Sequence, residues 1–416
     1  MADTAAHLVD NVLPRVPIRQ WVLSVPRVYR YYLARDASLL TRALRIFVSE
    51  IFRHYRRKLG VKRAQDGQGG ALTAVQRFGA FLNLNCHLHD LVLDGLFVRN
   101  PRTGALGFRR ARPPTSEDLE DVLNRTRLRL IRYLERKGFE VGDYSLRDPR
   151  EEGEGPGVQE IFQAASIRER IAIEGDGRPV PMEGREEGRL RERPDKPFSF
   201  DSGDGWSIEA GVRIRAGDRK ALERLCRYVL RPPFAQERLF DLEDGRYQYL
   251  FRRTRPDGAE SMTLTGVQLL EKLSALVPPP RSHLLRYHGV LAPHAKARPR
   301  VVPPEEPPPR REVAELPRRR RRRKRDREVG PPRRPRRGRR RRTPWAELLR
   351  RTFGYDVLEC PRCKGRMEVL ACITNAASVR RILRALGLPE EPPRAAPARS
   401  PPQLRFDFAQ DSSQAV

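Results

Sequence analysis

The chain has 416 residues, with 83 Lys and Arg against 53 Asp and Glu, so its formal net charge is +30. Its length allows two or three domains, and so basic a balance indicates a polyanionic partner, with nucleic acid as the first choice. No apolar run approaches the roughly 18 residues of a membrane span. Five cysteines, an odd number, argue against a disulfide framework, and no secretory signal is found at the N-terminus. We therefore expect a cytoplasmic protein that binds nucleic acid and not a membrane.

The first hundred residues are rich in apolar side chains. Residues 19–26 predict a strand that ends at Pro26. Residues 39–59 show helical spacing of apolar side chains, and residues 115–137 predict a second amphipathic helix with Ser116 as its cap.

Residues 82–89 alternate between apolar and polar side chains, which predicts a half-buried strand. His87 and His89 then point the same way, and Asp94-Gly95 predicts a tight hairpin directly after the strand. Two neutral imidazoles in this arrangement make half of a divalent metal site. The alternative is that both histidines merely form the wet face of an amphipathic strand.

The rest of the chain changes composition several times. Residues 148–205 are dominated by Gly, Glu, Asp and Pro, whereas 206–296 are globular in composition. Residues 297–343 hold 21 Lys and Arg against 6 Asp and Glu, which predicts a disordered basic linker that binds phosphates or, alternatively, a solvated tail without a role. Residues 344–388 predict a small module with a helix, Cys360 and Cys363 in CxxC spacing, a strand and a second helix.

The segment from Asp218 to Arg231 predicts a helix that Asp218 caps and that Pro232-Pro233 ends. Tyr228 lies on the shoulder of its apolar stripe. Three arginines surround this tyrosine and are candidates for DNA binding: Arg224, Arg227 and Arg231. A phenol among guanidinium groups is placed to approach phosphate, although a tyrosine beside arginines is also common in helix packing.

A His–apolar–His strand followed by a helical tyrosine resembles the HUH nucleases, which cut single-stranded DNA. Longer phrases resemble the rolling-circle insertion-sequence transposases, including their ISCR-like branch: residues 82–95, 227–239, 276–281 and 286–294, with Cys-Pro-Arg-Cys at 360–363. The resemblance covers roughly residues 3–300 and 344–388. It implies that His87 and His89 bind Mg²⁺ or Mn²⁺ and that Tyr228 is the catalytic nucleophile, which forms a 5′-phosphotyrosine.

The chain departs from that family in three respects. Some members carry a second tyrosine one helical turn before the first, where this chain has Arg224, so a single-tyrosine cycle is implied. Members also begin with a cysteine-rich zinc module that this chain lacks. The resemblance therefore predicts that the chain is truncated or that its start is misassigned. If it is truncated, the protein could be inactive. The basic linker is longer and richer in arginine than in the family.

The sequence does not decide the complete ligand set of either metal site. Gln76 and Asn85 are both candidates for a third metal ligand beside the histidines. Cys360 and Cys363 have zinc-knuckle spacing, and Cys372 adds one thiol, but a closed structural zinc site needs four ligands.

The expected fold class is α+β, an HUH-type antiparallel sheet with flanking helices, a disordered Arg/Pro-rich linker and a small C-terminal module. The expected function is a transposase that nicks and rejoins single-stranded DNA at element ends, without a small-molecule substrate. The alternatives are a plasmid-type rolling-circle replication initiator and a non-catalytic DNA-binding remnant. The sequence indicates no oligomeric state. The expected domains are nuclease parts 1–147 and 206–296, insertion 148–205, linker 297–343, module 344–388 and tail 389–416.

Overall fold

A computed structural model describes residues 1–100, 102–139, 157–173, 182–183, 197–255, 257–302, 343–369 and 372–391. Most of the predicted basic linker, including 318–325, and much of the predicted insertion lie outside these described residues. So does the predicted tail beyond residue 391.

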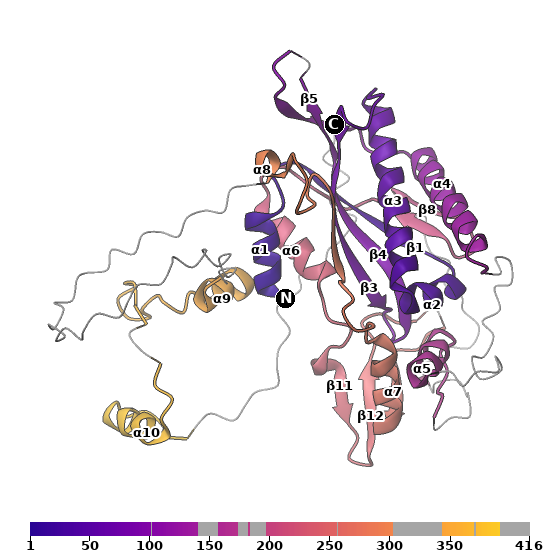
Figure 1. Ribbon diagram of the computed structural model, residues 1–416. Coiled ribbons are helices and arrows are strands. Elements are labelled where there is room, and N and C mark those ends of the chain that lie inside the picture. Colours follow the sequence, from indigo (N-terminus) through magenta and orange to yellow (C-terminus); the bar gives the residue numbers. More distant parts are fainter. Residues whose placement is uncertain are drawn as a thin grey trace, which may run out of the picture.

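A central antiparallel sheet forms the middle layer of the molecule (Figure 1). Its strand order is β14-β3-β4-β1-β9-β8, and β10 also pairs with β1. The strands are β1 (Ile18–Ser24), β3 (Gly70–Phe78), β4 (Leu84–Leu93), β8 (Ser199–Asp201), β9 (Ser207–Glu209), β10 (Arg213–Ile214) and β14 (Leu285–Gly289).

Helices cover both faces of this sheet. One face packs against α2 (Arg27–Arg35), α3 (Ala37–Lys58) and α4 (Ser116–Glu135) through a core that includes Trp21 and Phe47. The other face packs against α1 (Ala2–Asn11) and α6 (Arg219–Val229) through Leu91, Leu225 and other apolar residues. Because helices cover both faces, water is excluded from both sides of the central strands.

Two smaller sheets complete the fold. One contains β11 (Leu239–Asp241), β12 (Arg246–Leu250), β13 (Ser261–Thr265) and β7 (Met182–Glu183), and α5 (Val158–Ile167) and α7 (Gly266–Leu276) share its core. The other contains β2 (Gly67–Gln68), β5 (Gly95–Arg99) and β6 (Leu106–Arg110). The short helices are η2 (Gln236–Arg238) and α8 (Arg298–Val301), and α9 (Trp345–Phe353) and α10 (Ala376–Ala385) follow near the C-terminus.

This mixture of helices and antiparallel sheets confirms the predicted α+β class. None of the described helices combines the length and the apolarity needed to cross a membrane.

The predicted alternation of the histidine strand is confirmed. Cys86 and Leu88 are buried in the core that the sheet shares with α2, α3 and α4, whereas His87 and His89 face the side of the sheet that α6 covers. The strand begins at Leu84 rather than Leu82, whose φ of 51° lies in the left-handed region.

The hairpin predicted at Asp94-Gly95 is wrong. β5 leaves the central sheet and pairs with β2 and β6, not with β4. Asp94 is fully buried at this junction, where it accepts hydrogen bonds from Nε of Arg19 (2.9 Å) and Oη of Tyr55 (3.2 Å), and Arg213 lies 3.1 Å away. Gly95 is required by close approach, because a Cβ there would lie 2.1 Å from the Arg109 carbonyl oxygen. The Asp-Gly pair is therefore a buried anchor between two sheets.

Two helix boundaries also differ from expectation. The cap of α4 is Thr115 rather than Ser116, because Thr115 and Asp118 form a reciprocal capping box. Asp218 caps α6 as predicted, but the helix ends at Val229 rather than Arg231, since the residue before a proline avoids the helical region.

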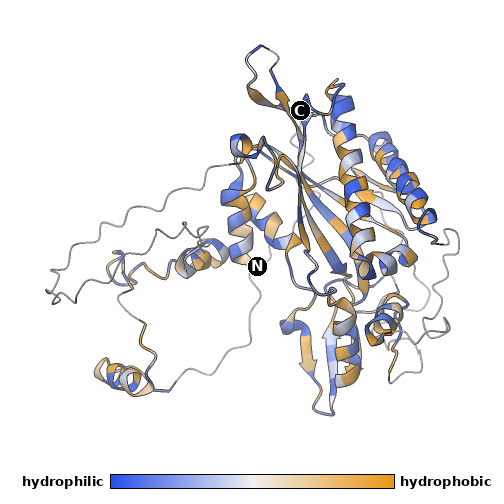
Figure 2. Cartoon of the chain, viewed as in Figure 1, coloured by the Kyte–Doolittle hydropathy of each residue, from blue (hydrophilic) through white to orange (hydrophobic). Residues whose placement is uncertain are grey.

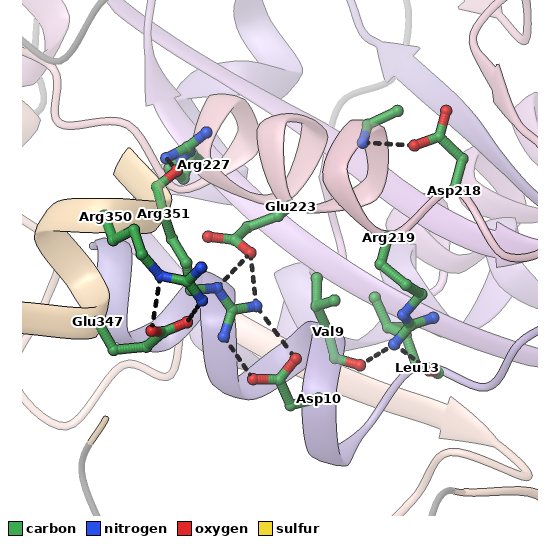
Figure 3. A network of polar contacts seen from close by, with 11 residues as sticks. Val9, Asp10, Leu13, Asp218, Arg219, Glu223, Arg227, Glu347, Arg350 and Arg351 are labelled. Carbon is green, nitrogen blue, oxygen red and sulfur yellow. Dashed lines mark hydrogen bonds and ion pairs between the residues drawn. The ribbon is translucent and has the colours of Figure 1, made fainter. Parts of the chain in front are cut away.

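Helix α9 docks against α1 and α6 (Figure 3). Arg351 pairs with Glu223 on α6 (2.6 Å) and with Asp10 on α1 (2.7 Å). The backbone amide of Thr343 donates to Asp3 (3.1 Å), and Nη1 of Arg227 donates to the Arg351 carbonyl oxygen (3.4 Å). These contacts hold α9 against the helix that carries Tyr228.

We predict that Asp94→Ala lowers the free energy of unfolding by about 3–5 kcal/mol, because it leaves the buried Arg19 guanidinium without its carboxylate. Urea denaturation measures the loss. Asp244→Ala is the matched control, because it breaks an exposed pair with Arg246 and should change little. Equal losses in the two variants would contradict the role of Asp94.

Candidate metal and tyrosine site

The two predicted metal ligands lie side by side on β4 and meet the predicted nucleophile on α6. The ring centroids of His87 and His89 are 4.8 Å apart. The ring of His89 meets the ring of Tyr228 edge-on, with centroids 6.1 Å apart and an interplanar angle of 87°. Residues separated by about 140 positions in the chain thus form one cluster.

Each imidazole is oriented by one hydrogen-bonding partner. Nδ1 of His87 lies 2.8 Å from the Asn85 carbonyl oxygen, so it carries the proton and leaves Nε2 with a lone pair. Nδ1 of His89 lies 2.6 Å from the side-chain amide of Gln20 on β1. Rotating that amide by 180° would present its oxygen to an Nδ1 proton, which frees the lone pair of Nε2.

Gln76 completes the cluster from β3, where it pairs directly with His87 across the strands. Its Nε2 donates to the Val229 carbonyl oxygen (2.9 Å), which fixes the amide. Its Oε1 and the Nε2 of His89 are both buried and have no hydrogen-bond partner among the described residues. Asn85, the other candidate for third ligand, also has a buried oxygen without such a partner.

The chemistry of these donors fits a divalent cation. Buried polar atoms normally have partners, so unpaired acceptors beside two imidazoles suit a positive ion. No carboxylate or thiol joins the two histidines, because the described residues contain no group of three His, Cys, Asp or Glu that could hold a metal. An amide oxygen is therefore the third ligand that this cluster offers.

The histidines are uncharged at neutral pH. Removal from water lowers the pKa of His87 to about 4, and the positive charge of Arg231 acts in the same direction. Burial also holds the pKa of His89 well below its usual range. Neutral imidazole is the form that binds a metal ion.

The three predicted DNA-binding arginines take different positions. Arg231 lies over the Tyr228 ring, with its guanidinium carbon 4.6 Å from the ring centroid. Arg227 contacts α9 instead, and Arg224 is half-exposed on α6. Arg252 was not predicted, yet it lies within electrostatic range of both Tyr228 and Arg231.

A cavity of about 370 Å³ opens beside this cluster. Gln76 and Arg231 line it together with mostly apolar side chains, including Phe78, Leu273 and Leu276.

Sequence reasoning missed Gln20 and Arg252. Gln20 lies diagonally across from His89 in the pairing of β1 with β4, and only that register places it on the imidazole. Arg252 lies in the loop after β12, whose position depends on the second sheet.

The predicted zinc cysteines lie apart from this site, beyond α9. The structure brings Cys360 and Cys363 together in one tight turn, and no third ligand among the described residues joins them, Cys372 included. The strand predicted between this turn and α10 is not found in residues 364–369 and 372–375.

Comparison with known proteins shows the family. A family model described as "Putative transposase" matches residues 70–299, more than half of the chain, and this range contains His87, His89, Gln76 and Tyr228. No curated protein and no solved structure gave a match. The chain belongs to this transposase family, a class of proteins that process DNA.

We predict that the metal-free protein loses stability as the pH falls from about 6.5 to 4. His87 has a lowered pKa in the folded state, so its contribution is present above the unfolded-state value of 6.5 and is lost as the pH falls toward about 4. Thermal denaturation in EDTA across this range measures the loss, and His87→Gln should reduce it. An identical pH profile in that variant would show that His87 does not titrate as its burial implies.

Proposed function

We propose that this transposase nicks and rejoins single-stranded DNA with Tyr228 as nucleophile and a divalent ion on His87 and His89. The observation that carries the proposal is the edge-on contact between the His89 and Tyr228 rings. This contact supports the proposal because a tyrosine nucleophile and the ligands of a cation would then lie side by side, the pair of groups that phosphodiester transesterification needs. A tyrosine beside two metal-binding histidines fits best the mechanism of the HUH nucleases, in the rolling-circle form of the ISCR-like transposases.

The donor set for the ion would be Nε2 of His87, Nε2 of His89 and Oε1 of Gln76. Gln76 is favoured over Asn85 as third ligand because its amide is already fixed by the Val229 carbonyl. When bound, Mg²⁺ or Mn²⁺ would polarise the scissile phosphate as a Lewis acid. Gln20 would orient the His89 ring from behind.

The protein's own residues would then act on the strand as follows. Oη of Tyr228 attacks the scissile phosphorus, and the bond from phosphorus to the 3′ oxygen breaks. The tyrosine is left joined to the 5′ phosphate, its proton passes to the departing 3′ oxygen, and a free 3′ hydroxyl results. Attack by a 3′ hydroxyl on the phosphotyrosine reverses these steps and rejoins a strand without ATP.

The arginines would hold the phosphate for this reaction. Arg231 and Arg252 lie close enough to Tyr228 to offset the charge of a phosphodiester. The cavity beside Gln76 and Arg231 has room for an unstacked base next to the scissile phosphate. Single-stranded DNA, whose bases are free to leave the stack, suits it better than a duplex.

We predict that Tyr228→Phe abolishes the covalent adduct while folding stability changes by no more than about 1.5 kcal/mol, since only a hydroxyl is removed. Labelled single-stranded DNA with Mn²⁺ is analysed on a denaturing gel, and mass spectrometry locates the nucleotide. Tyr247→Phe, on β12, is the matched control and should still form the adduct. A nucleotide attached to any other residue refutes the assignment.

We also predict that His87→Ala and His89→Ala each abolish cleavage but leave DNA affinity within a few-fold, since arginine and lysine contacts to phosphate dominate binding. Calorimetry should show that the double variant no longer binds Mn²⁺. Gln20→Ala should weaken Mn²⁺ binding about 10- to 100-fold. His283→Ala, outside the cluster, is the control, and normal cleavage by either β4 variant would exclude the metal site.

A further inference from the structure

The segment after the basic linker holds two thiols in a turn of a kind that binds zinc. The backbone amides of Arg362 and Cys363 donate to the Cys360 sulfur, and the two thiols are themselves hydrogen-bonded. The turn is closed by the amide of Cys360, which donates to the Gly365 carbonyl (2.9 Å), and by the amide of Lys364, which donates to the Cys360 carbonyl (2.9 Å). Both sulfurs therefore sit where one ion could bind them together.

This pair is half of a tetrahedral site. Structural zinc takes four protein ligands, and no third His, Cys, Asp or Glu joins the pair within the described part of the chain. Cys363 is exposed and Cys360 half-buried, so another protein surface can approach both sulfurs.

The helix that follows is also incomplete on its own. Val379, Ile382, Leu383 and Leu386 form an apolar stripe on α10, at the spacing of one helix face. No residue of α10 is buried, and the exposed fractions of Ile382 and Leu386 are 38% and 66%. Figure 1 shows α10 standing apart from the sheet, and Figure 2 shows hydrophobic residues along it.

A helix of ten residues has little stability in water without a packing partner. Its apolar stripe and the half-occupied ligand set lie on the same short segment, only 12 residues apart between Cys363 and Asn375. A single partner that covers the apolar stripe of α10 and supplies two further zinc ligands would complete both features.

We propose that the segment with Cys360, Cys363 and α10 is a dimerisation module, in which Cys360 and Cys363 from two copies of this chain bind one zinc ion and the two α10 helices pack together. A second copy is the partner that these features specify, because a two-fold axis through the ion supplies two identical thiols in the same turn. Binding releases four thiol protons and leaves a zinc tetrathiolate of charge −2. Arg362, Lys364 and Arg366 beside the turn would offset that charge.

The dimer would have a use if the proposed function holds. Each chain carries one tyrosine at the site, with Arg224 where a second could stand, and joining two strand ends is easier with two nucleophiles in one assembly. The ion pair between Arg351 and Glu223 holds α9 against the tyrosine helix. Dimerisation through the segment that follows α9 would therefore bring the tyrosine helices of two chains into one assembly. The dimer itself is argued from the thiols and α10 alone.

The test uses the full chain, without affinity tag, in the presence of zinc. With His87→Ala and His89→Ala introduced to remove the other candidate metal site, native mass spectrometry and elemental analysis should give a dimer with one zinc per two chains, and a strong chelator should convert it to monomer. Adding Cys360→Ser/Cys363→Ser to that background should give a zinc-free monomer, and the same two cysteine changes in the otherwise unmodified chain should leave the Tyr228 adduct intact. Because the assembly readout involves no DNA, failure of the dimer and failure of the cleavage mechanism are distinguishable.

Three further variants sharpen the result. Cys372→Ser should keep the zinc and the dimer, whereas loss of zinc would show that the site is completed within one chain. Ile382→Ser should raise the dimer dissociation constant at least tenfold, and Arg381→Ser, its neighbour off the apolar stripe, should not. With His87 and His89 replaced by alanine, one zinc per monomer, a dimer that survives the double cysteine change, or a zinc-free monomer with both cysteines intact each overturns the proposal.

Discussion

The arrangement of the site depends on one constraint: β4 is buried on both faces and still carries two imidazoles. A strand between two layers of helices must give each polar side chain a partner or a function, because an unpaired polar atom in such a place costs free energy. Gln20 and the Asn85 carbonyl provide part of that pairing. Within the described part of the chain, the Nε2 of His89 and the side-chain oxygens of Gln76 and Asn85 remain unpaired, and these are atoms that a cation would use. The same burial keeps the imidazoles neutral, so the folding requirement and the chemical requirement coincide.

The tyrosine helix is positioned from both sides. Its apolar stripe of Leu222, Leu225, Cys226 and Val229 packs on the sheet, which fixes the rotation of the helix and therefore the direction of Tyr228. The Val229 carbonyl oxygen also accepts a hydrogen bond from the side-chain amide of Gln76, which connects the end of the helix to β3 next to His87. On the outer side, Glu223 and Arg227 contact Arg351. The positions of Tyr228 and the two histidines are thus set by packing on one sheet, which is the kind of rigidity that a functional site requires.

The elements with strong periodicity could be predicted from sequence, and those set by long-range contacts could not. The side chains of the histidine strand alternate between the two faces of the sheet, and the tyrosine helix buries one stripe, so alternation and 3.6-residue spacing identified them. Asp94-Gly95 has the composition of a hairpin turn, but Arg19, Tyr55 and Arg213 pair with the carboxylate from distant parts of the chain and convert the turn into a buried junction. Gln20 could not be assigned for a similar reason, since only the register of β1 against β4 brings it to His89. The convergence of His89 with Tyr228 is likewise a property of the assembled sheet and not of either motif.

The docking of α9 bears on how far this protein can be divided. Glu223 is buried to 6% exposure on the tyrosine helix, and the cation that neutralises it comes from Arg351, beyond the whole basic segment. A chain cut after residue 302 would keep both histidines and Tyr228, yet Glu223, five residues before Tyr228, would lose the guanidinium that pairs with it. The boundary that composition suggests between the main domain and the C-terminal module is thus not an electrostatic boundary. In energetic terms, α9 belongs to the domain that carries Tyr228.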